Sequence, residues 1–311
     1  MAIFASVHDC IMALRHPDST GSHVTFAMKR LTVLFLCVMM TTACNEQEDS
    51  EGPNIASNRS EDFWEPGADW ILAWADEFDG DGLNESNWNR QVEPAGRFNE
   101  EWQRYTDSPE NAYVEGGLLV IKAEHVEDGH GMDHYTSARI NTAGKHAWTY
   151  GKIAARVQLP FGMGMWPAFW TLGANIDENG GDTPWPFVGE IDVLEFYGSK
   201  DDGAIEANLH YADATGSHAM MGVREYSLEA GRFADAFHVF EIEWNEREII
   251  WRVDGQEFTR EAIDTDERTE FHHDHFLLLN MAVGGTWAGR PDDSTVFPQY
   301  MLVDWVRVYQ R

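Results

Sequence analysis

Three carboxylates lie within six residues of one another in an otherwise apolar segment of this 311-residue chain. They are Glu190, Asp192 and Glu195, and Ile, Val, Leu and Phe separate and follow them. Acidic side chains are seldom buried in such surroundings without a partner or a task, and crowding of like charges raises the pKa of at least one of them. The cluster therefore offers an ionised nucleophile beside a protonated acid.

The spacing of these acids predicts a β-strand with one irregularity. Glu190 and Asp192 are two positions apart and share one face of a strand, whereas Glu195, five positions after Glu190, would point the other way. One extra residue at Val193-Leu194, a β-bulge, would bring all three acids to the same face. Retaining glycosidases need two carboxyl groups roughly 5–5.5 Å apart, so the Glu side chains would have to converge. The alternative, a solvated acidic strand edge, is disfavoured by the apolar neighbours.

Alternation with a period of two residues dominates the chain from Trp70 onward. Residues 152–159 and 238–244 place apolar side chains on one face and mostly polar ones on the other. Residues 249–253 end in Asp254-Gly255, a hairpin turn signal. Further β-rich runs lie at 118–123, 276–282 and 301–309. No stretch predicts a helix of a dozen residues, and the pattern predicts one all-β domain, an antiparallel β-sandwich of the jelly-roll type over 66–311.

The composition excludes two broad classes of protein. The chain has 53 acidic and 22 basic side chains, a formal net charge of −31. A surface this acidic repels phosphate backbones, so we expect no nucleic-acid partner. The 43% of hydrophobic residues supplies a large core, which excludes global disorder.

The N-terminal part of the chain has the layout of an export signal. Residues 31–40 are apolar, follow Lys29-Arg30 and are too few to cross a bilayer. We therefore assign 1–43 to export, with Met28 as the better candidate for the true start. The small residues that end in Cys44 resemble a bacterial lipoprotein signal, which predicts cleavage before Cys44 and its lipidation. Ordinary cleavage to a soluble secreted protein is the alternative.

Several expectations follow from that cleavage. The mature chain would keep Cys44 alone, without a disulfide or a cysteine nucleophile, because Cys10 and Cys37 lie upstream. Residues 44–65 are polar and acidic and predict a flexible tether. The lipid on Cys44 would be the only membrane attachment. Asn45, where a retention signal would have Asp, favours the outer membrane or cell surface by analogy with lipoprotein sorting.

The segment Glu190-Ile-Asp192-Val-Leu-Glu195 resembles the E-x-D-x-x-E signature of glycoside hydrolase family 16, in its bulge-containing branch. The similarity extends over nearly all of 70–311 and is strongest to bacterial laminarinases, which are endo-β-1,3-glucanases. It is carried by residues 74–78, 103–107, 135–142, 164–170, 185–189, 209–211, 279–285 and 297–309.

This resemblance implies a fold, a reaction and the roles of the three acids. The fold would be concanavalin A-like, with a concave substrate cleft. Glu190 would be the nucleophile, Glu195 the general acid/base, and Asp192 the residue that hydrogen-bonds and tunes Glu190. The substrate would be a polysaccharide, β-1,3-glucan, cleaved internally with retention and without a catalytic cofactor. We also expect a monomer.

Aromatic rings stack on the flat faces of sugars while polar neighbours bind the hydroxyl groups. Core packing competes with this role for any Trp, a surface ion pair for Arg139 and a purely structural role for His210. At the positions 99–100 and 210–213 the chain departs from the family, which often has paired Asn and His-Trp-Gly-Gly there. The expected substrate-binding residues are Trp166, Trp185, Arg139, His210, Asn99 and Trp287; for Trp70, Trp244, Trp251 and Trp305 core positions are favoured.

Family members often carry a calcium ion remote from the cleft, bound by backbone carbonyls and a carboxylate near the termini. The matching positions are Glu77, Gly116 and Asp304, which offer the oxygen donors that this cation prefers. The resemblance thus implies a structural Ca²⁺ that clamps the first strand to the last.

Two kinds of alternative function remain open from the sequence. The same fold could act on mixed-linkage β-glucan or on a marine galactan such as agar or porphyran, although sulfated galactans call for basic subsites. A catalytically silent β-glucan-binding sandwich is the rival from another class, since a fold alone does not determine function. Such proteins are expected to lose the carboxylates, and here all three are present.

Overall fold

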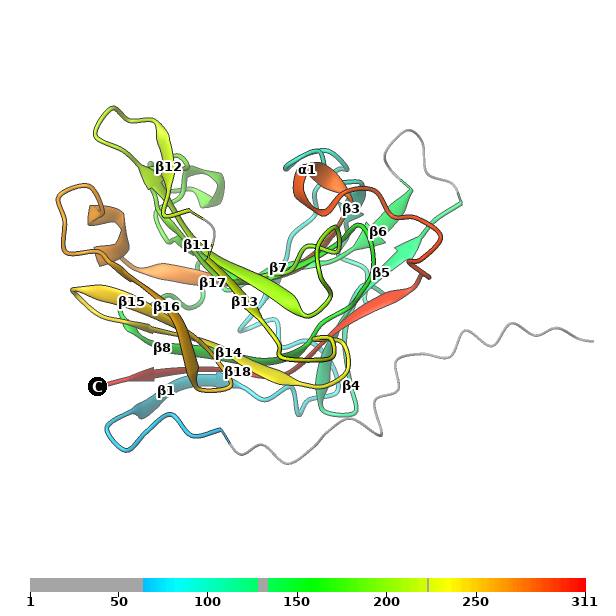
Figure 1. Ribbon diagram of the computed structural model, residues 1–311, viewed down its shortest axis with the longest axis horizontal. Coiled ribbons are helices and arrows are strands. Elements are labelled where there is room, and N and C mark those ends of the chain that lie inside the picture. Colours follow the sequence, from blue (N-terminus) through cyan, green and yellow to red (C-terminus); the bar gives the residue numbers. More distant parts are fainter. Residues whose placement is uncertain (1–63, 128–133, 223) are drawn as a thin grey trace, which may run out of the picture. The chain divides into compact units, whose positions relative to one another are not determined.

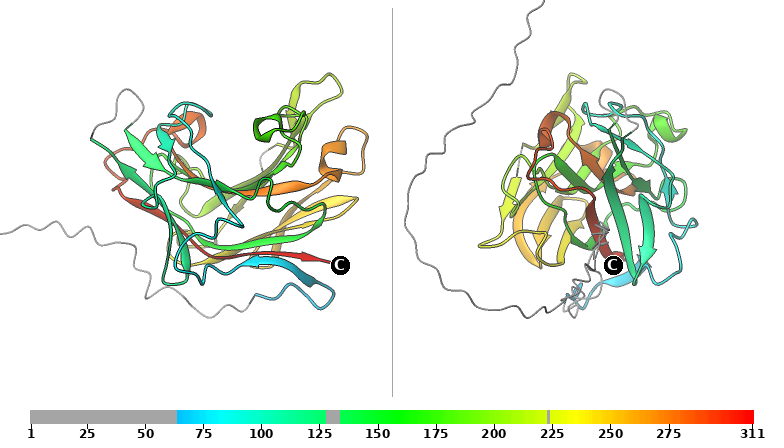
Figure 2. Two further views of the ribbon diagram at one scale, coloured as in Figure 1. Left: turned by 180° about the vertical axis from the view of Figure 1, so that it is seen from behind. Right: turned by 90° about the vertical axis from the view of Figure 1, so that its right-hand side faces the viewer.

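Two β-sheets packed face to face make up the part of the chain that the computed structural model describes, residues 64–127, 134–222 and 224–311 (Figures 1 and 2). The predicted export signal, Cys44 and nearly all of the predicted tether lie outside these residues. Among the residues described, no helix has the length and apolar character needed to cross a membrane.

The first sheet has ten strands and runs in the order β16-β15-β14-β8-β18-β5-β6-β3, with β1 also paired to β18 and β4 to β5. Its pairs are antiparallel except β3 with β6. Its strands are β1 (Ile71–Asp76), β3 (Gln103–Tyr105), β4 (Ala112–Glu115), β5 (Leu118–His125), β6 (Tyr135–Ser137), β8 (Gly151–Gln158), β14 (His238–Trp244), β15 (Glu248–Val253), β16 (Gln256–Ala262) and β18 (Gln299–Gln310).

The second sheet has eight strands in the order β12-β11-β10-β9-β17-β7-β2, and β13 also pairs with β11. The described helices are short: α1 (Gly285–Ala288) and the 3₁₀ turns η1 (Asp177–Asn179) and η2 (Thr269–His272). The strands are β2 (Asn89–Arg90), β7 (Arg139–Asn141), β9 (Met165–Gly173), β10 (Glu190–Glu195), β11 (Ala204–Ala212), β12 (His218–Met220), β13 (Arg224–Ser227) and β17 (His275–Val283).

Apolar side chains from both sheets fill the space between them, as alternation predicts. The core includes Ile153, Ala155 and Val157 of β8, Phe240, Ile242 and Trp244 of β14, Ile191 of β10, and Leu277, Leu279 and Met281 of β17. The turn predicted at Asp254-Gly255 joins β15 to β16, and both residues have positive φ, 50° and 78°. The predicted jelly-roll sandwich and the absence of a long helix are confirmed for the described residues.

The polar face of β8 is buried as well, which alternation alone does not predict. All eight residues of this strand are buried. Arg156 pairs with Asp304 of β18 at 2.5 Å, and Lys152 lies 3.4 Å from Glu241 of β14. Trp64, which precedes β1, packs on Trp305 with ring centroids 5.4 Å apart. Charged pairs and an N-terminal aromatic therefore cover the outer side of this sheet.

Candidate active site

The three acids lie on β10, a central strand of the second sheet, and the predicted bulge is present. Asp192 pairs with Trp170 of β9, but the next β9 residue, Phe169, pairs with Leu194, so Val193 is the extra residue. Against β11 the register shifts between Asp192 and Glu195 as well. An extra residue reverses the alternation of the side chains. Glu195 therefore returns to the face that carries Glu190.

The bulge is held from the inside of the protein. Val193 and Leu194 are consecutive, yet both belong to the core between the sheets. The indole Nε1 of Trp251, from β15 of the opposite sheet, donates a 2.8 Å hydrogen bond to the backbone carbonyl of Asp192. This bond satisfies a buried carbonyl at the point where the ladder becomes irregular. Trp251 is thus a core residue, as predicted, and also a support for β10.

Two tryptophans donate hydrogen bonds to the outer acids. Trp185 Nε1 lies 2.9 Å from Glu190 Oε2, and Trp166 Nε1 lies 3.1 Å from Glu195 Oε1. Trp185 is 43% exposed, whereas Trp166 is only 6% exposed and packs against Tyr197. Trp185 therefore offers a free ring face, while Trp166 presents mainly its polar edge to the acid.

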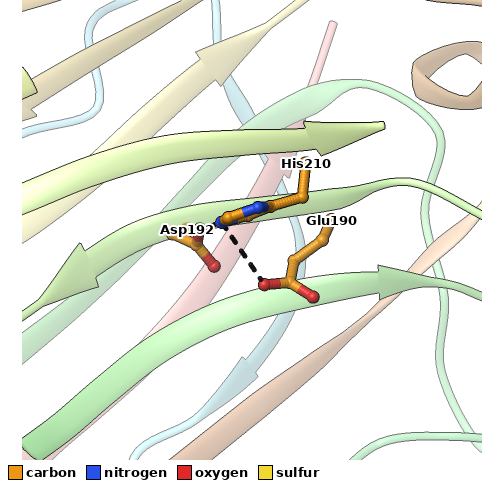
Figure 3. Close-up of side chains that lie close together, drawn as sticks. All are labelled: Glu190, Asp192 and His210. Carbon is orange, nitrogen blue, oxygen red and sulfur yellow. Dashed lines mark ion pairs between the residues drawn. The ribbon is translucent and has the colours of Figure 1, made fainter. Parts of the chain in front are cut away.

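His210 of β11 faces Glu190 and Asp192 (Figure 3). Its Nε2 lies 3.2 Å from Asp192 Oδ2 and 3.9 Å from Glu190 Oε1. Among the residues described, these three form the set of His and carboxylate groups whose ligand atoms lie close enough to share a cation. Asp192 is 2% exposed. His210 is the nearest cation-forming group to this buried carboxylate, which favours its protonated form.

Burial and mutual repulsion shift the titration of the acids. Burial raises the pKa of Glu190 and of Glu195 above the usual range, and the charge of Asp192 raises both further. His210, the Trp185 indole and Arg139 oppose this shift at Glu190, and a hydrogen bond from Tyr197 opposes it at Glu195.

The neighbouring carboxylates raise the pKa of His210. Burial alone would lower it, but the hydrogen bond to Asp192 and the three neighbouring carboxylates raise the pKa of His210 to about 9. His210 is therefore an imidazolium at neutral pH, and its charge partly compensates the crowded acids.

The acids open into a cleft of about 600 Å³. All the predicted substrate-binding residues line it, together with the three acids. Trp287, 58% exposed, lies in α1, and His210 lies on β11, and these two elements are separate in the fold (Figure 1). Further lining residues, which our sequence prediction missed, include Arg97, Phe98, Glu101, Trp170, Glu178, Tyr197, Lys200, Glu206, Asn208, His218, Met220 and Asn280.

Arg139 of β7 is fixed in the cleft wall instead of forming a surface ion pair. It is 6% exposed, and its guanidinium lies over the rings of Phe98 and Trp170 at 4.5 and 4.7 Å. Its Nε donates to Gln91 Oε1 at 2.9 Å. This packing pre-orients the remaining guanidinium donors.

Asn99 and Trp287 are tied together through one loop. The backbone N–H of Thr286 donates to the carbonyl of Asn99 at 2.9 Å. Gly285 has φ 89°, and a Cβ at this position would lie 2.9 Å from that same carbonyl, so only glycine fits. The Asn99 side chain donates to Glu101, a buried acid whose pKa is raised by burial.

One missed residue had a signal in the sequence and another had none. Tyr197 follows Glu195 by two positions, the spacing that places two side chains on one face, and it hydrogen-bonds Glu195. His218 lies across a turn from His210, and no period or motif connects them. The pairing of β11 with β12 brings them together.

The three positions expected to hold calcium lie around one stretch of β18. Register places Asp76 opposite Val306 and Leu119 opposite Val303, so the residue after Asp76 and the turn before β5 lie along the stretch of β18 that holds Asp304. Arg307 holds both carboxylate oxygens of Glu77, at 2.7 and 2.9 Å. Arg156 holds the carboxylate of Asp304, so both carboxylates of the expected calcium site have arginine partners.

Known proteins resemble this chain over most of its described length. The family model described as Glycosyl hydrolases family 16 matches residues 99–307. A beta-glucanase of Rhodothermus marinus is 39% identical over 252 residues, which cover 78% of this chain and 85% of that protein.

Two solved structures are similar in sequence and fold. The catalytic domain of an endo-1,3-beta-glucanase (laminarinase) from Thermotoga petrophila is 41% identical with a TM-score of 0.68, over 78% of this chain and 98% of that one. LamA of Zobellia galactanivorans, in complex with laminaritriose and laminaritetraose, is 33% identical with a TM-score of 0.69, over 77% and 98%. These similarities fit the bulged strand and the cleft described above. The chain therefore belongs to glycoside hydrolase family 16.

Proposed function

We propose that this glycoside hydrolase cleaves β-1,3-glucan internally and with retention of configuration, by double displacement at Glu190 and Glu195. The observation that carries the proposal is the bulge, which turns both acids and Asp192 toward one cleft. A nucleophile and an acid on one strand face can act on the same glycosidic bond.

We assign the nucleophile to Glu190 and the general acid/base to Glu195, the roles that their positions in the E-x-D-x-x-E segment imply. Glu190 receives the Trp185 hydrogen bond and lies near the His210 imidazolium and Arg139. Glu195 receives hydrogen bonds from Trp166 and Tyr197, and the charge of Asp192 raises the pKa of both acids. The azide experiment described below separates the two roles.

The reaction then proceeds in two steps. Glu190 attacks the anomeric carbon, the glycosidic C–O bond breaks, and the Glu195 proton passes to the leaving oxygen. A water molecule next gives its proton to the ionised Glu195 and attacks the anomeric carbon, which frees the Glu190 carboxylate. Asp192 keeps His210 charged and close to Glu190 throughout both steps.

The substrate class rests on the relatives and on the character of the cleft. The similar proteins include a laminarinase catalytic domain and a complex with laminari-oligosaccharides. Exposed indole faces at Trp185 and Trp287 suit stacking on neutral sugars. Lys200 is paired with Glu206 and Arg97 with Glu178, which leaves Arg139 and the His210 imidazolium as the other cationic groups that line the cleft. A heavily sulfated galactan would need more.

Release of reducing sugar from a panel of polysaccharides tests the substrate. Because cleavage is internal, laminarin should release oligosaccharides from the start of the reaction. We expect less product from mixed-linkage β-glucan and none from agar or porphyran. Preferred cleavage of either galactan would overturn the substrate. Binding to laminarin without cleavage would place this chain with silent glucan-binding members of the fold.

The roles of the two acids can be separated with azide. When Glu190→Ala is given an activated β-glucoside, azide attacks directly from the vacated side, and we expect the α-glycosyl azide. In Glu195→Ala the glycosyl–enzyme still forms and azide replaces water, so we expect the β-glycosyl azide. The same azide product from both variants would contradict the assignment.

We also propose a structural calcium ion remote from the cleft. Calcium bound by main-chain oxygens at Glu77 and Gly116, beside the Asp304–Arg156 pair, would link the start of the fold to its last strand. Bound calcium found by metal analysis after dialysis, and a lower melting temperature in chelator, would support this proposal.

For Cys44 we propose lipidation after export, tested by fatty-acid labelling of wild type and Cys44→Ser. We propose a monomer, to be tested by light scattering.

A further inference from the structure

His218 is a cleft residue with no role in the proposed reaction so far. It begins β12, directly after the turn that follows β11, and it pairs with Ala212. Asp213 stabilises this turn by accepting hydrogen bonds from Thr215 and from the Ser217 backbone, at 2.6 to 2.9 Å. The His218 side chain therefore projects from a well-formed hairpin, toward the face that carries His210.

The two imidazoles are in direct hydrogen-bond contact. His218 Nε2 lies 2.8 Å from His210 Nδ1, and the ring centroids are 5.1 Å apart. The other nitrogen of His210 faces Asp192 at 3.2 Å. An imidazolium donates from both nitrogens, so His218 must accept through Nε2 and carry its own proton on Nδ1.

Contacts through Trp185 join His218 to Glu190 by a second route. The Trp185 and His218 rings lie 4.6 Å apart, and the same indole donates to Glu190 Oε2 at 2.9 Å. His210 Nε2 approaches the other oxygen, Oε1, at 3.9 Å. The four side chains thus form a closed ring of contacts around the proposed nucleophile.

We infer that His218 is a positioning residue, which accepts the Nδ1 proton of His210 and so fixes the His210 imidazolium against Asp192 and Glu190. The inference rests on the proposed function, because its catalytic consequence requires Glu190 to react as a carboxylate. The β11–β12 hairpin then contributes to the position of the His210 imidazolium, in addition to any contribution to substrate binding.

Protonation of the two rings is consistent with this assignment. The pKa of His210 is raised to about 9, and the pKa of His218 is lowered by burial and by the charge of His210. One ring is thus the donor and the other the neutral acceptor. The charged groups around the pair are Asp192, Glu190 and Glu195 of β10, Glu206 of β11, Lys200 before β11, Arg139 of β7, and Glu270 and Arg268 near the hairpin base.

Three variants separate the hydrogen bond from the ring packing. His218→Phe keeps an aromatic ring against Trp185 but removes the acceptor. His218→Gln loses the ring but places a carbonyl oxygen near the position of Nε2. Thr215→Ala removes the hydroxyl contacts with Asp213 and Ser217 in the turn and keeps His218, so it reports the effect of a looser hairpin alone.

Two measurements are needed, pH profiles of kcat and kcat/KM on laminarin, and imidazole ¹⁵N shifts of His210 during a pH titration. A hydrogen bond to a charged group is worth enough to change rates by about tenfold. We expect His218→Phe to lower kcat about tenfold with little change in KM and to lower the pKa of His210. His218→Gln should recover kcat to within about threefold of wild type, and Thr215→Ala should leave the titration of His210 unchanged.

Two results would overturn the inference. One is an unchanged His210 titration in His218→Phe; the other is an equal loss of kcat in the Phe and Gln variants, which would assign His218 to packing. The NMR titration does not depend on turnover. If wild type failed to cleave any β-glucan, the proposed function would fail while the titration still tested the contact between the two histidines.

Discussion

Among the described residues, the buried carboxylates on the outer side of the first sheet and those of the cleft have different partners. On the outer side of the first sheet Glu241 is 1% exposed and lies 3.4 Å from Lys152 and 3.5 Å from Arg252. Asp304 is paired with Arg156 on the same sheet. Each of these acids lies against permanent cations.

In the cleft the acids lie against one another. Asp192 shares its strand face with Glu190 and Glu195, and its cation is His210, which can lose its proton. Burial with a permanent partner keeps a carboxylate ionised and inert, whereas burial beside like charges leaves its proton available for transfer. The same residue type is structural in one region and reactive in the other because of its neighbours.

The largest effect should come from removing a reactive acid. Glu190→Gln or Glu195→Gln should lower kcat/KM on laminarin by about 10⁴-fold, because each variant removes a group that acts in the transition state. The melting temperature should not fall, since like-charge repulsion is removed as well. Steady-state kinetics and thermal denaturation of the same preparations would show this. A variant with more than a tenth of wild-type activity would contradict the comparison.

The opposite result, a loss of stability without a loss of activity, should come from the outer side of the first sheet. Arg156→Met leaves Asp304 buried without its guanidinium partner, and we expect the free energy of unfolding to fall by about 3–5 kcal/mol. The folded fraction should keep its kcat, because the pair is remote from the cleft. Urea unfolding measures the loss. Arg260→Met, which breaks exposed pairs with Glu248 and Glu257, is the control and should change the midpoint little.

A smaller effect is expected at the acid between the two catalytic candidates. Asp192→Asn should lower kcat by about 10- to 100-fold, because it keeps the size of the side chain but removes the charge that holds His210. The same charge raises the pKa of Glu190 and Glu195, so both limbs of the pH profile should move to lower pH. If the pH profile of Asp192→Asn has the same limbs as that of wild type, Asp192 does not raise the pKa values of these two acids.

The smallest effect concerns the pH dependence of stability. Glu195 has a raised pKa in the folded state, so folding favours its protonated form. Its contribution to stability is lost as pH rises from the unfolded value, about 4.3, through the folded value. Glu195→Gln should therefore gain stability over wild type as pH rises above the unfolded pKa. Parallel melting curves from acid to neutral pH would contradict this.

Much of the sheet structure was predictable because alternation has a strict period. The spans 238–244 and 249–253 agree with β14 and β15 within one residue, and the parity of Glu190, Asp192 and Glu195 located the bulge. Alternation does not show what covers a polar face, so the burial of Arg156 and Lys152 on β8 was not predictable.

The cleft was predictable where its residues lie on the same strand and less so where loops supply them. Trp166 was expected as a stacking platform, but its ring is largely packed against Tyr197 and Ala288, and its indole N–H serves Glu195. His218 depends on the pairing of β11 with β12, which only tertiary structure reveals. The two-residue alternation within one strand carries no information on which side chains meet across a turn.

The hydrogen bond from Trp251 to the Asp192 carbonyl has a consequence for how sequence changes are interpreted. A residue of the opposite sheet, with no surface in the cleft, holds the main chain at the point where the catalytic strand departs from regular geometry. Selection for activity and selection for folding therefore act on the same indole. Phe at this position would fill most of the same volume and would leave the carbonyl without its donor. In a survey of random variants, Trp251 would appear as a distant position that alters turnover.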